Sequence, residues 1–252
     1  MNPFRIAVVT ALALTAATSL ASAEGSLSVS PVRLDIGSHA MSGVLVVAND
    51  GDTAVDAIAV PYHWSQTADK PQVLEDAPDI AVFPRQFHLE PYARRTLRIG
   101  TLKASDGQER AYRIIVTQLP SERGSATQAN GLRFATRFSI PVFVGGDRGG
   151  SVALQSAAVH DASLSLTLGG PATRHAYVRS AHVDALDAAG GVLASADIGG
   201  WYVLPASSQR WQGRFGSNVC RHIASLHVHG TDDEGSALDV HVTPERTCSA
   251  RP

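Results

Sequence analysis

Apolar residues alternate with small or polar residues in short segments through most of the chain. Successive side chains of an extended strand point to opposite faces, so this alternation predicts strands that each bury one face. The first half holds about seven such segments, at residues 26–36, 43–49, 54–64, 80–90, 92–102, 110–120 and 131–144. Residues 67–78 are polar and contain prolines, so we expect a loop there. No segment of convincing length has the period of a helix.

The second half continues in the same way after a cluster of glycines at residues 145–150. Because this cluster is flexible and has no periodicity, it predicts a hinge between two domains. Further strands are expected at residues 151–161, 163–170, 175–186, 192–205, 209–215, 222–230 and 237–244. Many short strands separated by turns are typical of β-sandwiches, and 252 residues accommodate two immunoglobulin-sized units. We therefore expect an all-β protein with domains at residues 24–145 and 146–252.

The segment at residues 131–144 is the most informative single stretch. One face of this predicted strand carries an apolar row that consists of Leu132, Phe134, Phe138 and Ile140. The opposite face is partly basic and carries Arg133, Ala135, Arg137 and Ser139. A strand of this kind fills the core of its own domain, or it offers its edge and apolar side chains to a partner that lacks a strand. Periodicity alone leaves both interpretations open.

The first 23 residues have the features of a secretory signal peptide. Arg5 precedes an apolar run that ends in Ala21-Ser22-Ala23, a small-x-small cleavage pattern. We expect cleavage after Ala23, which places the mature protein outside the cytoplasm. In that environment Cys220 and Cys248 are most simply read as one disulfide, with two buried free thiols as the alternative.

Charge and motifs narrow the range of functions. A formal net charge of −2 argues against broad attraction to nucleic acid or to anionic membranes. This net charge still allows a local basic patch. No catalytic or nucleotide-binding motif is present, so we expect neither an enzyme nor a cofactor. Four histidines lie near one another in the last part of the chain: His222, His227, His229 and His241. Either a metal site or a solvated, histidine-rich sheet surface explains them, and the sheet surface explains them without any metal.

Several segments resemble the periplasmic chaperones of the chaperone-usher pathway, which assemble pili and fimbriae. The most specific fragment is ERAYR at residues 109–113 followed by Pro120, supported by SPVRLDI at 30–36 and PRQFHLEPYARRTLRI at 84–99. The ending SIPVFV at 139–144 is similar to the archaic, spore-coat-protein-U-like branch, as is WYVLPASSQRW at 201–211. The resemblance implies two immunoglobulin-like sandwiches in a boomerang arrangement and a non-enzymatic function.

The resemblance also implies a mechanism, donor-strand complementation, in which the chaperone lends a strand to an incomplete pilus subunit. The donor side chains would be Leu132, Phe134, Phe138 and Ile140. Arg33 and Arg137 would hold the carboxylate at the subunit's C-terminus, with Ser139 as an assistant at the position of the family's lysine. Tyr112 and Arg113 are assigned to structure and not to binding.

The implied partners are pilus subunits and an outer-membrane usher. Because the free chaperone would expose an apolar row, we expect capping or self-association. The alternative function is an exported immunoglobulin-like protein, metal-binding or adhesive, that uses His227, His229 and His241.

Overall fold

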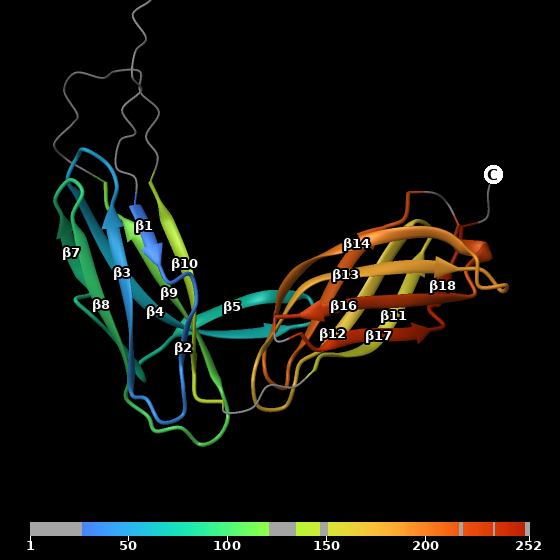
Figure 1. Cartoon of the computed structure of the whole chain (residues 1–252), viewed down its shortest axis with the longest axis horizontal. Helices are drawn as coiled ribbons and strands as arrows, with labels where there is room; N and C mark the ends of the chain where they lie inside the picture. Colours follow the sequence, from blue (N-terminus) through green and yellow to red (C-terminus); the bar gives the residue numbers. More distant parts are fainter. Residues whose placement is uncertain (1–26, 121–134, 147–150, 217–218, 234, 250–252) are drawn as a thin grey trace, which may run out of the picture.

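The computed structural model describes residues 27–120, 135–146, 151–216, 219–233 and 235–249. The predicted signal peptide lies outside these residues. Two elongated all-β lobes are set at an angle to each other, and β4 and β5 of the first lobe reach toward the second (Figure 1). Within the described residues, the one helical element is a 3-10 turn at Cys220–His222, and no helix is long and apolar enough to cross a membrane.

The first domain is a sandwich of two sheets. Its strands are β1 (Leu27–Ser30), β2 (Leu34–Ile36), β3 (Ser42–Asn49), β4 (Val55–Thr67), β5 (Lys70–Asp76), β6 (Ile80–Phe83), β7 (Gln86–Leu89), β8 (Arg94–Thr101), β9 (Arg110–Gln118) and β10 (Arg137–Val144). One sheet has the order β1-β3-β8-β6, and the other has the order β2-β10-β9-β4-β5 with β7 paired to β4. Alternate residues such as Leu45, Leu97 and Ile114 are fully buried between them, as the alternating pattern predicts.

Two details of the first domain differ from the sequence prediction. One strand was predicted at residues 26–36, but residues 27–36 form two, because β1 pairs with β3 in one sheet and β2 pairs with β10 in the other. Pro31, which has no N–H to donate, lies where the chain changes sheets. The loop predicted at residues 67–78 is wrong, since β5 pairs with β4 in an antiparallel hairpin. No residue of β5 is fully buried, and its sequence therefore lacks the alternation that identifies a strand.

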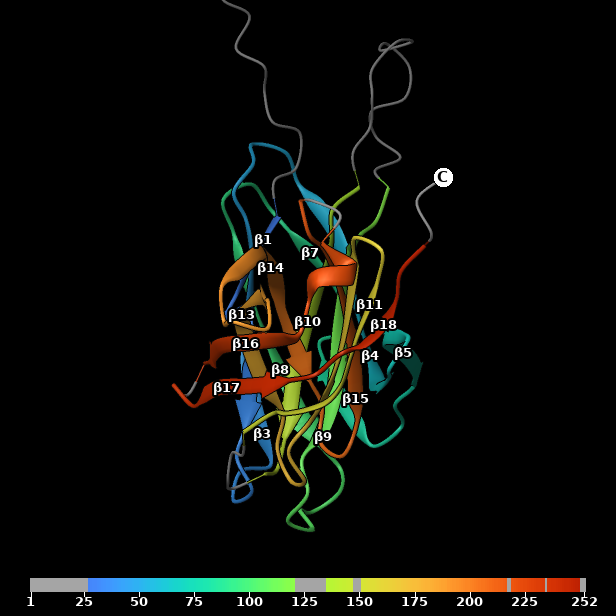
Figure 2. The same ribbon diagram turned by 90° about the vertical axis from the view of Figure 1, so that its right-hand side faces the viewer.

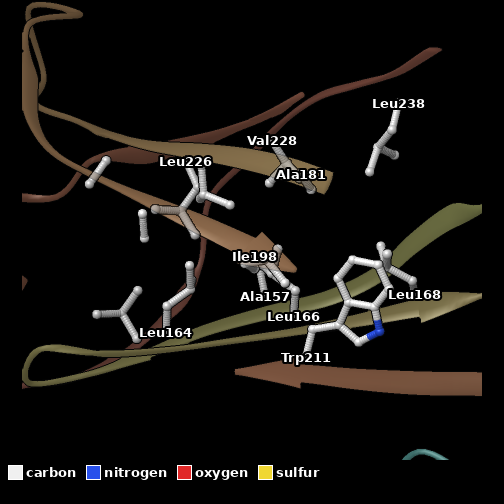
Figure 3. Packing of buried hydrophobic residues seen from close by; sticks show 14 of the residues in the cluster. Ala157, Leu164, Leu166, Leu168, Ala181, Ile198, Trp211, Leu226, Val228 and Leu238 are labelled. Carbon is white, nitrogen blue, oxygen red and sulfur yellow. The ribbon is translucent and has the colours of Figure 1, made fainter. Parts of the chain in front are cut away.

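The second domain is also a two-sheet sandwich. Its strands are β11 (Ala153–His160), β12 (Ser163–Gly169), β13 (Ala176–Leu186), β14 (Val192–Val203), β15 (Ser208–Arg214), β16 (Ser225–Asp232), β17 (Ala237–Val242) and β18 (Glu245–Thr247). The sheets have the orders β15-β12-β11-β18 and β14-β13-β16-β17. Figure 3 shows Leu164, Leu166 and Trp211 of the first sheet facing Ile198, Leu226 and Val228 of the second.

The disulfide joins Cys220 in the 3-10 turn to Cys248 just after β18, with Cα atoms 5.8 Å apart. Cys220 is fully buried in the second-domain core. The bridge therefore fixes the last described segment of the chain to the domain, and the alternative of two free thiols does not apply to the structure.

A small apolar cluster lies between the two domains. Trp64, Ala111 and Phe143 from the first domain pack with Leu204 from the second, and Trp201 contacts the same cluster. Phe143 also stacks on the ring of a second-domain histidine, with a centroid separation of 3.5 Å. Figure 2, in which the second domain faces the viewer, shows β4 beside β15. The domains are thus in direct contact and are not joined by the linker alone.

Buried polar groups complete the contact between the domains. Glu109, in the ERAYR fragment, accepts hydrogen bonds of 2.8 Å from both the backbone N–H and Nδ1 of His175. Gln66 donates to the carbonyl of Tyr202 at 2.9 Å and accepts from the N–H of Leu204 at 2.9 Å. Because these groups are buried, losing a partner would leave an unsatisfied polar atom.

The glycines at the domain junction have a steric role as well as flexibility. Gly145 and Gly146 have φ angles of +85° and +73°, which side chains rarely tolerate. A Cβ on Gly146 would lie 2.9 Å from the Cβ of Glu109. The first two residues of the predicted hinge are therefore packed closely against residues 108–109. The domain limits at residues 145 and 146 stay predictions.

Candidate functional site

The strand β10 has one partner along its whole length and an open edge along part of the other side. It pairs antiparallel with β9 from Arg137 to Val144. On its other side, β2 pairs in parallel with Val142–Val144 only. For residues 137–141, the described part of the chain supplies no strand on that side. This stretch is an exposed edge next to the domain junction, of the kind that accepts an added strand.

The backbone groups that face this open edge can be assigned from the pairing. The N–H of Gln118 donates to the carbonyl of Thr136 at 2.9 Å. Antiparallel pairs alternate between residues that exchange hydrogen bonds and residues that do not. The backbone groups of Arg137 and Ser139 therefore point away from β9, to the open edge. Pro141 follows at the next outward position, where its missing N–H breaks no bond to β9.

The apolar row of the sequence prediction is divided by the structure. Ile140 is 5% exposed and belongs to the core of the first domain, and Phe138 is half-buried against the same core. Ile140 is thus buried in the core of its own domain. This burial does not agree with its predicted role as a donor side chain. Leu132 and Phe134, like Arg133, lie outside the described residues.

Arg33, the first predicted anchor, lies in the bend between β1 and β2. Its Nε is 2.9 Å from Asp35, and its Nη1 contacts Asp233 of the second domain at 2.5 Å. Burial opposes its charge, but the hydrogen bond to Asp233 and the nearby Asp35 outweigh this and raise the pKa of Arg33. The structure therefore uses Arg33 in an ion pair between the domains, at one side of the junction.

Arg137, the second predicted anchor, is exposed at the start of β10. Ser139 is exposed as well, and its carbonyl accepts a hydrogen bond of 3.3 Å from Nη1 of Arg113. The side chains of Arg113, Arg137 and Ser139 lie on the same outer face of the sheet, because Arg113 is opposite Pro141 in the register. Arg113 is therefore the basic residue that the fold brings beside Ser139.

Arg113 is a buried cation with unusual surroundings. It is 4% exposed, and its guanidinium lies 3.7 Å above the ring centroid of Trp64 and 5.6 Å from that of Trp201. Its Nε and Nη2 are buried without a hydrogen-bond partner among the described residues. Burial lowers the pKa of Arg113 to about 10, so it keeps its charge at neutral pH.

Tyr202 connects the two arginines. Burial raises the pKa of the Tyr202 phenol, while the charges of Arg33 and Arg113 act in the opposite direction. Both cations thus lie close enough to act on one phenol. Arg33 has two carboxylate neighbours, whereas no described hydrogen bond or ion pair joins Arg113 to a carboxylate. The junction therefore combines two cations, a phenol and the open strand edge.

Sequence reasoning assigned Arg113 to structure and missed its chemistry. The available signal was an arginine between Tyr112 and Ile114, inside a run at residues 111–116 with no other charged residue. A charged residue at such a position is buried only at a cost, which itself suggests a function.

The predicted histidine group is placed on the second domain. His227, His229 and His241 lie together on β16 and β17, whereas His222 is exposed in the 3-10 turn.

Comparison with known protein families gives a match over the part of the chain that contains β10. Residues 26–147 match the family model for "Pili and flagellar-assembly chaperone, PapD N-terminal domain". This match covers the first domain from β1 through β10. A search of curated protein sequences gives no match.

Solved structures match nearly the whole chain in fold. The chaperone–tip adhesion subunit complex of Csu pili from Acinetobacter baumannii contains a chain with a TM-score of 0.59 and 19% identity; the match covers 88% of this chain and 100% of that chain. The YadV chaperone gives a TM-score of 0.57 at 15% identity, covering 86% and 98%. The Salmonella enterica SafA pilin–SafB chaperone complex gives 0.55 at 16% identity, covering 86% and 96%. These likenesses establish a shared two-domain fold.

Proposed function

We propose, from the match of the first domain to the pilus-chaperone family, that this protein is a chaperone that binds pilus subunits by donor-strand complementation. The observation that carries the proposal is the open edge of β10 at residues 137–141. An incomplete sandwich that lacks a strand has an unpaired edge and an apolar groove, and a lent strand covers both. The matched proteins are named as chaperones, and the function is accordingly non-enzymatic.

Main-chain groups and side chains have separate tasks in this proposal. The outward backbone groups of Arg137 and Ser139 begin the ladder with the subunit. Leu132 and Phe134 fill the subunit's groove, and each contributes about 1.5–3 kcal/mol when it is fully buried. Phe138 lies where the apolar row leaves the first-domain core. Ile140 we leave out of the donor row, because it is part of that core.

The basic groups at the junction would bind the carboxylate at the C-terminus of the subunit. An arginine fork suits a carboxylate because it provides two charge-assisted hydrogen bonds. Arg33 and Arg137 remain in the proposal, and we add Arg113, whose free donors lie beside Ser139. Arg33 would exchange part of its contact with Asp233 for the incoming carboxylate. Holding this terminus fixes the register of the subunit on β10.

We further propose the cellular setting. The signal-peptide pattern and the family match support a periplasmic location, with delivery of subunits to an outer-membrane usher. The SIPVFV sequence and the likeness to the Csu complex support the archaic branch of the pathway. Capping or self-association of the free chaperone would cover the open edge until a subunit arrives.

Two pairs of variants test the donor strand, with co-purification of a co-expressed pilus subunit as the readout. Ser139→Pro removes an N–H that faces the open edge and leaves the pairing with β9 intact, so subunit binding should fall. Ser139→Ala keeps this N–H and removes only the hydroxyl, so it should bind the subunit more tightly than Ser139→Pro. Full binding by Ser139→Pro would exclude the open edge as the binding site.

The second pair tests the apolar row. Phe134→Asp places a charge in the donor row and should abolish co-purification. Phe83→Asp changes a phenylalanine that is 76% exposed on β6 and should have no effect. Equal binding by both variants would contradict the assignment of Phe134. Circular dichroism of the free variants checks that the chaperone remains folded.

A further inference from the structure

Two adjacent rows of polar side chains cross the outer face of the sheet β14-β13-β16-β17. The register aligns Asp197, His182, His229 and Asp239 in one row, and Ser195, Asp184, His227 and His241 in the next. The residues between them along the strands, such as Val183 and Val228, are buried in the second-domain core. Four histidines and three carboxylates thus share one face, away from the domain junction.

One carboxylate lies between two imidazoles in this array. His182 Nε2 is 3.2 Å from Asp184 Oδ1, and His229 Nε2 is 3.4 Å from Asp184 Oδ2. The candidate ligand atoms of these three residues all lie within 4.8 Å of one another. Two imidazole nitrogens and one carboxylate oxygen form a ligand set that suits Zn²⁺ and similar divalent transition metals.

Two further contacts orient these ligands in the way that metal sites require. His182 Nδ1 is 2.6 Å from Asp197 Oδ1. A metal-binding histidine commonly donates its other ring N–H to a carboxylate, which fixes the tautomer and leaves the remaining nitrogen for the metal. Ser195 donates a hydrogen bond of 2.5 Å to Asp184 Oδ1. This bond holds the Asp184 carboxylate in place between the two imidazoles.

We propose that His182, Asp184 and His229 form a binding site for one divalent transition-metal ion, with Zn²⁺ as the best-suited ion. Asp197 acts as a positioning residue, and water completes the coordination. All three ligands are partly buried. The ion would link β13 to β16 and stabilise the second domain. This inference does not depend on the proposed chaperone function.

A neighbouring group is the rival site. His227, Asp239 and His241 also have ligand atoms within 4.8 Å of one another, but Asp239 and His241 are exposed. Asp239 lies 2.8 Å from His227 Nε2, and the rings of His227 and His241 stack at 4.1 Å. The experiment must therefore distinguish the two groups.

Calorimetric titration of the tag-free, EDTA-treated chain with ZnCl₂ tests the proposal, at about pH 8 so that most histidines are neutral. We expect one ion to bind per chain and to raise the melting temperature, because a ligand of the folded state stabilises it. His229→Gln should abolish this binding, and Asp197→Asn should weaken it at least tenfold, the lower limit for such positioning groups. The melting temperature of Asp197→Asn in EDTA should equal that of the wild type.

The matched controls are His241→Gln in the rival group and His160→Gln, an exposed histidine on β11. Both should bind zinc like the wild type. The proposal is overturned if the wild type shows no saturable binding. It is also overturned if His241→Gln removes the binding while His229→Gln, shown to be folded by circular dichroism, retains it.

Discussion

The guanidinium of Arg113 lies 3.7 Å above the ring centroid of Trp64 at the junction of the two domains. The indole face stabilises the cation, but it gives no hydrogen bond to the buried Nε and Nη2. A buried cation with unused donors is costly in the free protein. This cost is consistent with a group that is kept for a ligand, and a carboxylate supplies both the charge and the acceptors that are missing.

Arg113→Met is therefore expected to separate binding from stability. Methionine keeps an unbranched apolar stem against Trp64 and removes the unsatisfied donors. We expect subunit affinity to fall at least tenfold, in line with about 1.5–3 kcal/mol for a hydrogen bond to a charged group. The free energy of unfolding of the free chaperone should stay equal or rise by about 1 kcal/mol. Chemical denaturation and subunit titration measure the two effects.

Two controls accompany this variant. Arg94→Met changes an exposed arginine on β8, in the other sheet, and should alter neither quantity. A subunit that lacks its C-terminal residues should bind the wild type and Arg113→Met equally weakly. Unchanged affinity of Arg113→Met for the intact subunit would remove Arg113 from the anchor and leave Arg33 and Arg137.

The strands of both domains were largely predictable because most of them bury one face. The sequence then alternates between apolar and polar residues, as it does around Leu226 and Val228. The strand β5 was missed for the complementary reason. It extends beyond the sandwich, buries no residue fully and is held by main-chain pairing with β4. Main-chain hydrogen bonds leave no pattern in the sequence.

The candidate site was predictable only in part. The apolar row identified β10, but periodicity does not say where a strand leaves its own core, and Ile140 proved to be inside it. The role of Arg33 depends on Asp233, which is 200 residues away in the chain. Arg113 acquires its surroundings from Trp64, Trp201 and Tyr202, which three-dimensional packing brings together.

Glu109→Ala is expected to loosen the contact between the domains. Glu109 accepts two hydrogen bonds from His175, and its removal leaves the buried backbone N–H of His175 without an acceptor. We expect a loss of about 1–3 kcal/mol in the free energy of unfolding. The radius of gyration in small-angle scattering should increase. Glu75→Ala, on the exposed face of β5, is the control and should change neither value.

Asp79 is expected to make the first domain sensitive to acid. Burial favours its neutral form, but the hydrogen bond of 2.9 Å from the Tyr112 hydroxyl and the charge of His63 outweigh burial and lower the pKa of Asp79. An unfolded aspartate has a pKa of about 3.9. The stabilisation is therefore present above this value and is lost as the pH falls through the lower folded-state pKa.

The variant Asp79→Asn tests this pH dependence. At about pH 7, it should cost about 1–3 kcal/mol, because the buried Tyr112 hydroxyl loses a charged acceptor. The difference from the wild type should shrink in urea unfolding curves measured progressively below about pH 4. A difference that stays constant from neutral to acid pH would show that the charge of Asp79 does not contribute.

The disulfide is expected to stabilise the second domain specifically. Cys220 and Cys248 are 28 residues apart in sequence, and closing a loop of this length contributes about 3–4 kcal/mol in the chain-entropy model. The double variant Cys220→Ser/Cys248→Ser should therefore lower the unfolding temperature of the second domain. Reduction of the wild-type protein should have a similar effect, whereas the double variant should not respond to reductant. Scanning calorimetry with and without reductant measures both, and an equal response of the variant and the wild type would mean that the reductant acts elsewhere.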